Sequence, residues 1–465
     1  MKVINNGRFR AAIPVFLLTL TVTGGLLFKP AGLRADTAAG NEIEREIQQI
    51  RERGEPVTLA ELVPEEIPES ENGAAVYRQA FQLFQELKIK NPERWKYIPY
   101  EGGLEWPQVP APEKAAVRNL LLAHPDFLRF YQLLEKAAGM RCQFLRRSDY
   151  RGIDTELPHL ASLRSCARML AARADLKADA GDIEGALRDC LTGFRMAGTL
   201  KEEPVIISGL VRIAIDNNML NCLEEVIQRG EATPETGRDL ILKIREEREA
   251  RLFYRGLLGE RVLFGLPIFR RLEEKAGQQA ALDQLANALG ATEPIKAALG
   301  ADTDLAGLIS ENLATYLQAM NQLITFYDLP YRERQAKTDA LRKELLELPD
   351  RKVALVKLAM PALLGLPLNE TRLDARLGNA MIALGCRRYR EKQGAWPESL
   401  KELSPEKAPG FLPELPLDPF TGREYVYRKR GKGFIVYSLG ENLKDEGGRR
   451  GEGAKRWDYD IVWQE

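Results

Sequence analysis

Apolar residues recur at every third or fourth position through most of this chain, which is the spacing of one face of an α-helix. After Asn72, for example, Val76, Ala80, Phe84 and Leu87 fall on one stripe. Similar stripes run from residue 112 to about 365, and prolines mark several of their starts or kinks. They predict helices at 205–229, 235–256, 258–288, 303–326, 331–345 and 351–364. The middle of the chain is therefore expected to be all-α.

Two of these stripes are joined by a short turn. Apolar side chains lie at helical spacing from Leu160 to Ala174 and again from Ile183 to Phe194. Gly181 and Asp182 stand between them, where glycine suits the turn and aspartate can cap the second helix. We therefore expect an antiparallel helical hairpin within a multi-helix body that covers residues 71–366.

The pattern changes near residue 367. A last helix over 371–394 is followed by a stretch rich in Pro, Gly, Tyr and Val, in which apolar and polar residues alternate. This alternation predicts two strands, near 425–427 and 434–437, joined by the turn RKRGKG. Residues 367–465 are thus expected to form a small α+β module at the end of a mainly α protein.

The first 40 residues predict a protein that is exported. A basic start, MKVINNGRFR, precedes an apolar run of 18 residues and a polar exit near Ala35. This is the pattern of a signal peptide, although a run of this length can also stay as an N-terminal membrane anchor, so residues 1–35 are expected to be one or the other. The expected location is the periplasm, the cell surface or the membrane. Residues 36–70, acidic with one short helical pattern, are expected to be a linker.

Composition narrows the classes of function. Lys plus Arg and Asp plus Glu number 67 each, so no net charge favours nucleic acid over another partner. The two histidines, His124 and His159, have no partner at the spacing of a zinc site or a Ser-His-Asp triad, and we interpret them as capping or packing residues. The five cysteines show no CxxC motif and are expected to be buried thiols rather than a disulfide framework.

Several uncommon motifs follow one another near the C-terminus. After the last helix come GAWP, LPLDPFTG, YVY and YSLG, and then an acidic, glycine-rich loop. Over about the last 95 residues this order resembles the globular domain of the major pseudopilins of type II secretion systems. That family holds a calcium ion in its final loop, and hard oxygen donors on a flexible loop suit calcium. The resemblance therefore implies a calcium site whose candidate ligands are the carboxylates of Asp445, Glu446, Asp458 and Asp460 and the backbone carbonyl of Leu439.

Basic residues in the same loop leave a second interpretation open. Arg449, Arg450, Lys455 and Arg456 would repel a dication and could pair with the acidic side chains instead. Asp418, which precedes a proline, is interpreted as the cap of a turn. The start of the chain lacks the glutamate through which pseudopilins assemble into filaments. As a whole, the chain is similar to a group of uncharacterised exported bacterial proteins that join a helical body to this tail, a likeness that implies no activity.

Two carboxylates inside apolar helical runs, Glu260 and Asp216, are the candidates for catalysis. Burial raises the pKa of a carboxyl group, and two such groups across a helical cleft could hydrolyse a polymer of the cell envelope. The alternative is that Glu260 pairs with Arg255 or Arg261 and that Asp216 lies at a helix surface. The sequence carries none of the common hydrolase, nucleotide-binding or metalloprotease motifs. The first hypothesis is therefore a non-catalytic envelope protein, a helical scaffold for protein partners, and a carboxylate-dependent hydrolase is the alternative.

Overall fold

The computed structural model describes residues 38–101, 104, 106–269, 305–406, 410–453 and 457–465. The predicted signal peptide or anchor, residues 1–35, lies outside these ranges, as do residues 270–288 of the helix predicted to begin at 258. Within the described ranges, no helix combines the length and the apolar character needed to cross a bilayer.

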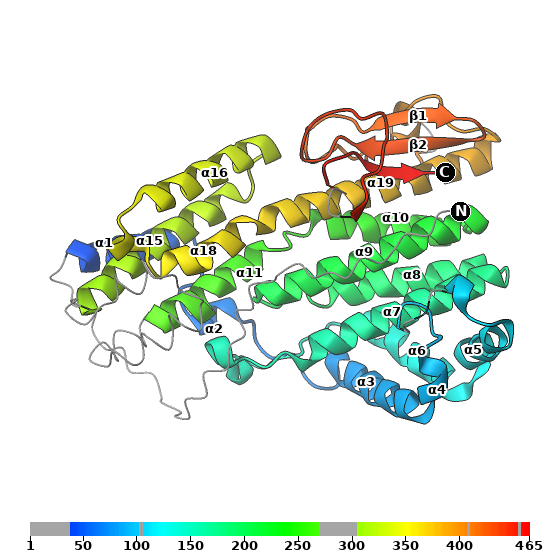
Figure 1. Cartoon of the computed structure of the whole chain (residues 1–465), viewed down its shortest axis with the longest axis horizontal. Helices are drawn as coiled ribbons and strands as arrows, with labels where there is room; N and C mark the ends of the chain where they lie inside the picture. The colour runs from blue at the N-terminus through cyan, green and yellow to red at the C-terminus, as the bar shows by residue number, and fades with distance from the viewer. Residues whose placement is uncertain (1–37, 102–103, 105, 270–304, 407–409, 454–456) are drawn as a thin grey trace.

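The described chain is elongated and mainly helical, with one small sheet near its C-terminus (Figure 1). Its first helices are α1 (Ala38–Glu52), α2 (Leu59–Leu62), α3 (Gly73–Lys90), α4 (Pro92–Trp95), α5 (Ala111–Ala123) and α6 (Pro125–Ala138). The central ones are α7 (Pro158–Asp179), α8 (Ile183–Gly198), α9 (Ile206–Arg229), α10 (Pro234–Glu249), α11 (Tyr254–Gly259) and the π-helical η4 (Glu260–Gly265). Then come α15 (Leu305–Phe326), α16 (Tyr331–Glu347), α17 (Asp350–Val353), α18 (Val356–Leu364) and α19 (Leu366–Gln393).

The remaining elements are short. The 3-10 helices are η1 (Trp106–Gln108), η2 (Arg147–Asp149), η3 (Gly152–Asp154) and η5 (Leu400–Leu403). The strands are β1 (Val426–Arg430), β2 (Gly433–Ser438) and β3 (Ile461–Gln464). The predicted fold class, a multi-helix body followed by a small segment that contains strands, is confirmed at this level.

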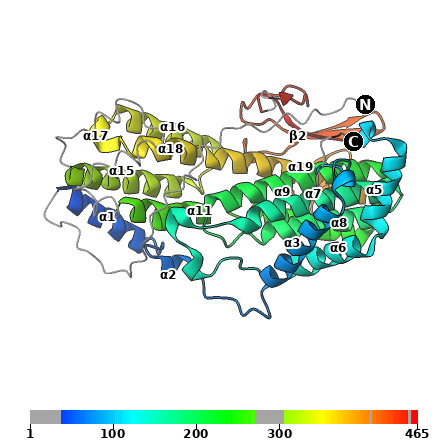
Figure 2. The same cartoon turned by 60° about the horizontal axis from the view of Figure 1, so that its bottom comes forward.

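Helices α7 and α8 form the antiparallel hairpin that the sequence predicts. Gly181 has a left-handed backbone with φ of +86°, and the Asp182 side chain accepts a hydrogen bond of 2.9 Å from the Gly185 N–H at the start of α8. Helix α9 packs against both, so these three helices form the centre of the body (Figure 2). Leu, Ala, Met and Cys side chains fill the space between them, which is why the apolar period is so regular here.

The segment expected to be a linker belongs to the fold. Helix α1 packs along α15, and Ile43 and Ile50 are fully buried. Asn321 of α15 also donates a hydrogen bond of 2.7 Å to the Glu46 carboxylate. The linker prediction for residues 36–70 is therefore corrected. The segment contains an amphipathic helix whose narrow apolar stripe packs against α15, and its acidic composition gave no indication of this contact.

Helix α19 belongs to the body and to the C-terminal module at once. It runs from beside α18 to the sheet (Figure 1), and it packs on α9 and α10 as well as on β2 and β3. Gly378 permits a close approach, since a Cβ atom there would lie only 2.1 Å from the Tyr425 hydroxyl oxygen. Asn379 donates a hydrogen bond of 2.7 Å to the Ile461 carbonyl. One hydrophobic cluster includes residues of both parts, so the expected boundary at 367 does not separate two cores.

The C-terminal sheet has three antiparallel strands in the order β1-β2-β3. Strands β1 and β2 are joined by the two-residue turn Gly431–Lys432, in which Gly431 has φ of +62°. Pairing with β2 runs from Val426 to Arg430, so the whole RKR segment assigned to the turn is strand. Strand β3, near the end of the chain, pairs with the other edge of β2. The predicted hairpin is thus longer than expected, and a third strand joins it.

Asp418 caps a turn beside this sheet, as predicted. Its Oδ1 accepts a hydrogen bond of 3.0 Å from the Phe420 N–H, and its Oδ2 accepts one of 3.1 Å from the Thr421 hydroxyl. The Ser438 hydroxyl, at the end of β2, donates to the same carboxylate at 2.7 Å. Asp418 therefore ties the turn to the sheet and has a structural role.

Candidate functional site

The loop that joins β2 to β3 holds the predicted metal ligands. Gly440, Gly447 and Gly448 have positive φ angles in it, a backbone region that favours glycine. The path of the loop brings Glu446 close enough to Asp460, the residue before β3, for the two charges to repel each other. These two residues are the pair of acidic side chains that the fold brings together.

Glu446 and Asp460 each have one satisfied and one unsatisfied carboxylate oxygen. Glu446 Oε1 accepts a hydrogen bond of 2.9 Å from the Asn442 side chain, and Asp460 Oδ2 accepts one of 2.8 Å from the Gly448 N–H. Glu446 Oε2 and Asp460 Oδ1 are buried and accept no hydrogen bond of normal geometry among the residues that the structure describes. The backbone N–H groups of Glu446 and Arg449 nevertheless lie near enough to the Asp460 carboxylate to lower its pKa. Burial raises the pKa of Asp460 to about 6, and the charge of Glu446 contributes. Buried oxygens of this kind are suited to a cation.

The other three predicted ligands have different surroundings. Asp445 accepts hydrogen bonds of 2.8 Å from the Tyr437 hydroxyl and 3.0 Å from Arg428, and the bond from Tyr437 lowers the pKa of Asp445. The Asp458 side chain is exposed, and Leu439 is half-buried. Within the described ranges, no group of three or more His, Cys, Asp or Glu side chains is arranged to hold a metal ion. The side chains of the predicted set therefore do not converge as a whole on one point.

The ion pairs of this loop also differ from those expected. Arg372 of α19 pairs with Glu441, whereas Arg450, from the loop itself, pairs with Glu224 of α9. Two more of the expected cations fall outside the described ranges: Lys455 and Arg456. In the part of the chain that the structure describes, the carboxylates of Glu446 and Asp460 form no ion pair.

Asp216 lies in the interior of the body and not at a helix surface, so the surface interpretation is wrong. It is fully buried on α9, and neither carboxylate oxygen has a hydrogen-bond partner among the described residues. Arg212, one turn earlier, is buried too and donates a hydrogen bond of 2.9 Å to Glu247 of α10. The Lys243 Nζ lies 2.8 Å from the same glutamate. These four residues form what we call the α9–α10 charge cluster.

The pKa of Asp216 reflects this setting. Burial raises the pKa well above its ordinary value, and the negative charge of Glu247 raises it further. Arg212 and Lys243 oppose the shift without cancelling it. A buried carboxyl group of this kind favours the protonated form.

Glu260 begins the π-helical segment η4, which continues α11 without a break. Its side chain is half-buried, burial raises its pKa to about 7, and it has no ion pair within the described ranges. The arginines expected to pair with it bind elsewhere: Arg261 donates to Glu55 at 2.7 Å, and Arg255 donates to the Leu62 carbonyl at 2.8 Å. The predicted ion pair is therefore wrong. Short π-helical segments occur often at functional sites.

The two candidate catalytic carboxylates do not share a cleft. Gly259, next to Glu260, packs closely against the Pro204 carbonyl, just before α9 begins at Ile206. Asp216 is three turns further along α9, roughly 15 Å away at ~1.5 Å per residue. The two carboxylates of a glycosidase lie about 5–10 Å apart. Glu260 and Asp216 therefore do not form such a pair.

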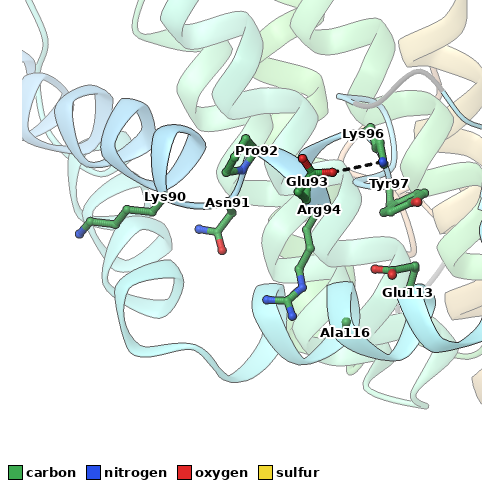
Figure 3. A pocket seen from close by; sticks show the side chains of 9 residues that line it. All are labelled: Lys90, Asn91, Pro92, Glu93, Arg94, Lys96, Tyr97, Glu113 and Ala116. Carbon is green, nitrogen blue, oxygen red and sulfur yellow. Dashed lines mark hydrogen bonds and ion pairs between the residues drawn. The ribbon is translucent and has the colours of Figure 1, made fainter.

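Two surface pockets lie apart from all these residues. One, of about 380 Å³, lies where the end of α3, α4 and α5 meet (Figure 3). Lys96 pairs with Glu93 there at 3.4 Å, while Lys90 points away from the other side chains. The second, of about 520 Å³, is lined by Leu59, Pro64, Glu65, Glu66, Arg147 and Ser148. Their mixed polar linings indicate no particular chemistry.

Sequence reasoning missed the charged neighbours of Asp216. Arg212 stands four residues earlier on the same face of the helix, a recognisable spacing for an ion pair. The approach of Lys243 and Glu247 from α10 depends on how the two helices pack, which the sequence pattern does not contain. Comparison of the chain with known protein families, curated proteins and solved structures finds no match.

Proposed function

We propose that this chain is a non-catalytic protein of the cell envelope, in which a helical scaffold presents a pseudopilin-like, calcium-stabilised C-terminal module to protein partners. One observation carries the proposal: the buried, unsatisfied oxygens Glu446 Oε2 and Asp460 Oδ1 lie in the loop where the resemblance implies calcium. Export, through residues 1–35 as signal peptide or anchor, is part of the same proposal and follows from the sequence.

A calcium ion held by Glu446 and Asp460 would supply the partner that these two oxygens lack. It would also offset the repulsion between the two carboxylates, which raises the pKa of Asp460. Calcium accepts about six to eight oxygen ligands in flexible arrangements, so carbonyls of the loop and water can complete the shell. Asp445 keeps its contacts to Tyr437 and Arg428 in this arrangement, which makes the carboxylate set smaller than the resemblance implies.

Contacts between the module and the body support a scaffold. Gln228 of α9 donates a hydrogen bond of 3.2 Å to the Gln464 carbonyl of β3, and Arg248 of α10 donates one of 3.2 Å to the Leu417 carbonyl. The side chains of Lys429 and Arg430 on β1 are exposed beyond these contacts. The body would therefore present this edge of the sheet to a partner in a fixed orientation.

Calcium should raise the thermal stability of the full chain. An ion that binds only the folded state stabilises it by about 2–3 kcal/mol at a concentration a hundredfold above its Kd. Because the unfolding entropy is ~2.1 cal/mol/K per residue, we expect the Tm of this chain of 465 residues to rise by roughly 2–3 °C between chelator and millimolar calcium. The full chain is needed because α19 also packs on α9 and α10. Differential scanning calorimetry makes the measurement.

Variants of the loop separate calcium binding from general charge effects. Glu446→Gln and Asp460→Asn should lose the rise in Tm. Glu441→Gln, which removes a negative charge from the same loop but one that pairs with Arg372, should keep it. An unchanged Tm of the wild-type chain in calcium, or an equal rise in all three variants, would contradict a site at Glu446 and Asp460.

A hydrolase that uses Glu260 is the second candidate, and the raised pKa of this residue is the observation that favours it. A carboxyl group with a pKa of about 7 can donate a proton at neutral pH. The wild-type chain should then release soluble fragments from peptidoglycan, and Glu260→Gln should lower the rate at least 100-fold. Glu202→Gln, at an exposed glutamate, is the control. Wild-type release no faster than the blank would reject this candidate.

A further inference from the structure

Two of the cysteine side chains touch in the centre of the body. Cys190 lies on α8 and Cys222 on α9, and their sulfur atoms are 3.6 Å apart. Both residues are buried, with exposed fractions of 0% and 1%. Cys142, Cys166 and Cys386 have no sulfur contact of this kind within the described part of the chain.

We propose that Cys190 and Cys222 form a disulfide bond that links α8 to α9. A disulfide needs sulfur atoms about 2.05 Å apart, so the two atoms must approach by roughly 1.5 Å. Adjustment of the two side chains can supply most of this movement, because the helices already pack side by side. The proposal goes beyond the expectation of five unpaired thiols, and it does not depend on the calcium site. It rests on the proposed export, because disulfides form and persist in oxidising compartments.

The reaction is a thiol–disulfide exchange with an external disulfide, such as oxidised glutathione. The thiolate of one cysteine attacks a sulfur of the oxidant and releases one reduced thiol, and the thiolate of the other then displaces the second. The bond between Cys190 and Cys222 forms while the bond in the oxidant breaks. The two electrons and the two protons of the protein thiols end on the two released thiols.

Burial determines when this exchange takes place. Neither sulfur is exposed in the folded chain, and contact with Cys190 and burial raise the pKa of Cys222 well above its ordinary value. Attack therefore requires α8 and α9 to be apart, during folding or a later opening of the body. Once the helices close, the bond is shielded from reductants by α7, whose Ala171 carbonyl lies 3.8 Å from the Cys222 sulfur.

Thiol counting on the full chain tests the proposal. The reduced protein is unfolded in urea, refolded in a mixture of oxidised and reduced glutathione, denatured at low pH and alkylated with N-ethylmaleimide. We expect three labelled cysteines instead of five, and a linked pair of peptides that contains Cys190 and Cys222 and weighs 2 Da less than the two reduced peptides together. When the same glutathione mixture is applied to the chain unfolded in urea, the linked peptides should show no preference for Cys190 with Cys222 over other cysteine pairs.

Two single variants check the assignment. Cys222→Ala should leave four labelled cysteines, with Cys190 among them, and Cys166→Ala should keep the linked pair. Peptide mapping of the wild-type chain does not depend on whether these variants fold. Five labelled cysteines in the refolded wild-type chain, or a different linked pair at comparable yield, would overturn the proposal.

Discussion

Replacing Arg212 with alanine should lower the free energy of unfolding by about 3–5 kcal/mol, the range measured when one partner of a buried ion pair is removed. Arg212 is 3% exposed and Glu247 is 2% exposed, so neither charge has water to replace its partner. Asp216, already unsatisfied, would also lose the nearest positive charge on its own helix. Lys243 remains beside Glu247 and should keep the loss toward the lower end of the range. Urea unfolding at pH 7 measures the difference.

The control is an ion pair on the surface. Lys343 and Glu347 lie four residues apart on α16 with side chains 77% and 68% exposed, and Lys343→Ala should change stability by less than ~0.5 kcal/mol. Arg212→Met together with Glu247→Leu should recover much of the loss, because an apolar pair of similar volume avoids the cost of burying charge. A loss below ~1 kcal/mol for Arg212→Ala would mean that water reaches the α9–α10 charge cluster.

The helical body could be predicted because its apolar residues repeat with the period of the helix. The turn at Gly181 and Asp182 was predicted for a local reason, since a left-handed glycine and a side-chain cap act within a few residues. Helix α1 could not be recognised as part of the body because the reason for its apolar residues is not local. Its stripe is narrow and its surface acidic, and only α15, more than 250 residues later, explains why Ile43 and Ile50 are apolar.

The candidate site was harder to predict because its geometry is set by contacts between distant segments. Asp216 stands next to Asn217 and Asn218, and these polar neighbours suggested a helix surface. Helix α9 instead packs against α7, α8 and α19, so a polar residue on it can lie in the core. In the tail the sequence indicated an acidic loop, but the path of the backbone decides that Glu446 meets Asp460 while Asp445 binds Arg428.

Glu260→Gln should stabilise the protein at pH 8 by about 3 kcal/mol and have little effect near pH 4. The ordinary pKa of this carboxyl is 4.5, and burial raises it to about 7 in the folded chain. Between these values the unfolded chain has released the proton and the folded chain has kept it, so wild-type stability falls by roughly 1.4 kcal/mol for each pH unit. Above pH 7 both states are ionised and the loss stays constant. Glutamine has no proton to release in this range, so the free energy of unfolding of the variant does not fall in the way that the wild-type value does.

The difference between wild type and variant isolates Glu260 from other groups with raised pKa values, such as Asp460, because those titrate equally in both proteins. Urea unfolding at intervals from pH 4 to pH 8 gives the two curves, and they should separate chiefly between pH 5 and 7. Glu347→Gln, at an exposed position, should follow the wild-type curve throughout. Parallel curves for wild type and Glu260→Gln would show that the carboxylate is hydrated, and a hydrated carboxylate would remove the pKa argument for a hydrolase as well. Separated curves without release of peptidoglycan fragments would instead make Glu260 a buried acid that destabilises the fold at neutral pH, which is what the scaffold proposal expects.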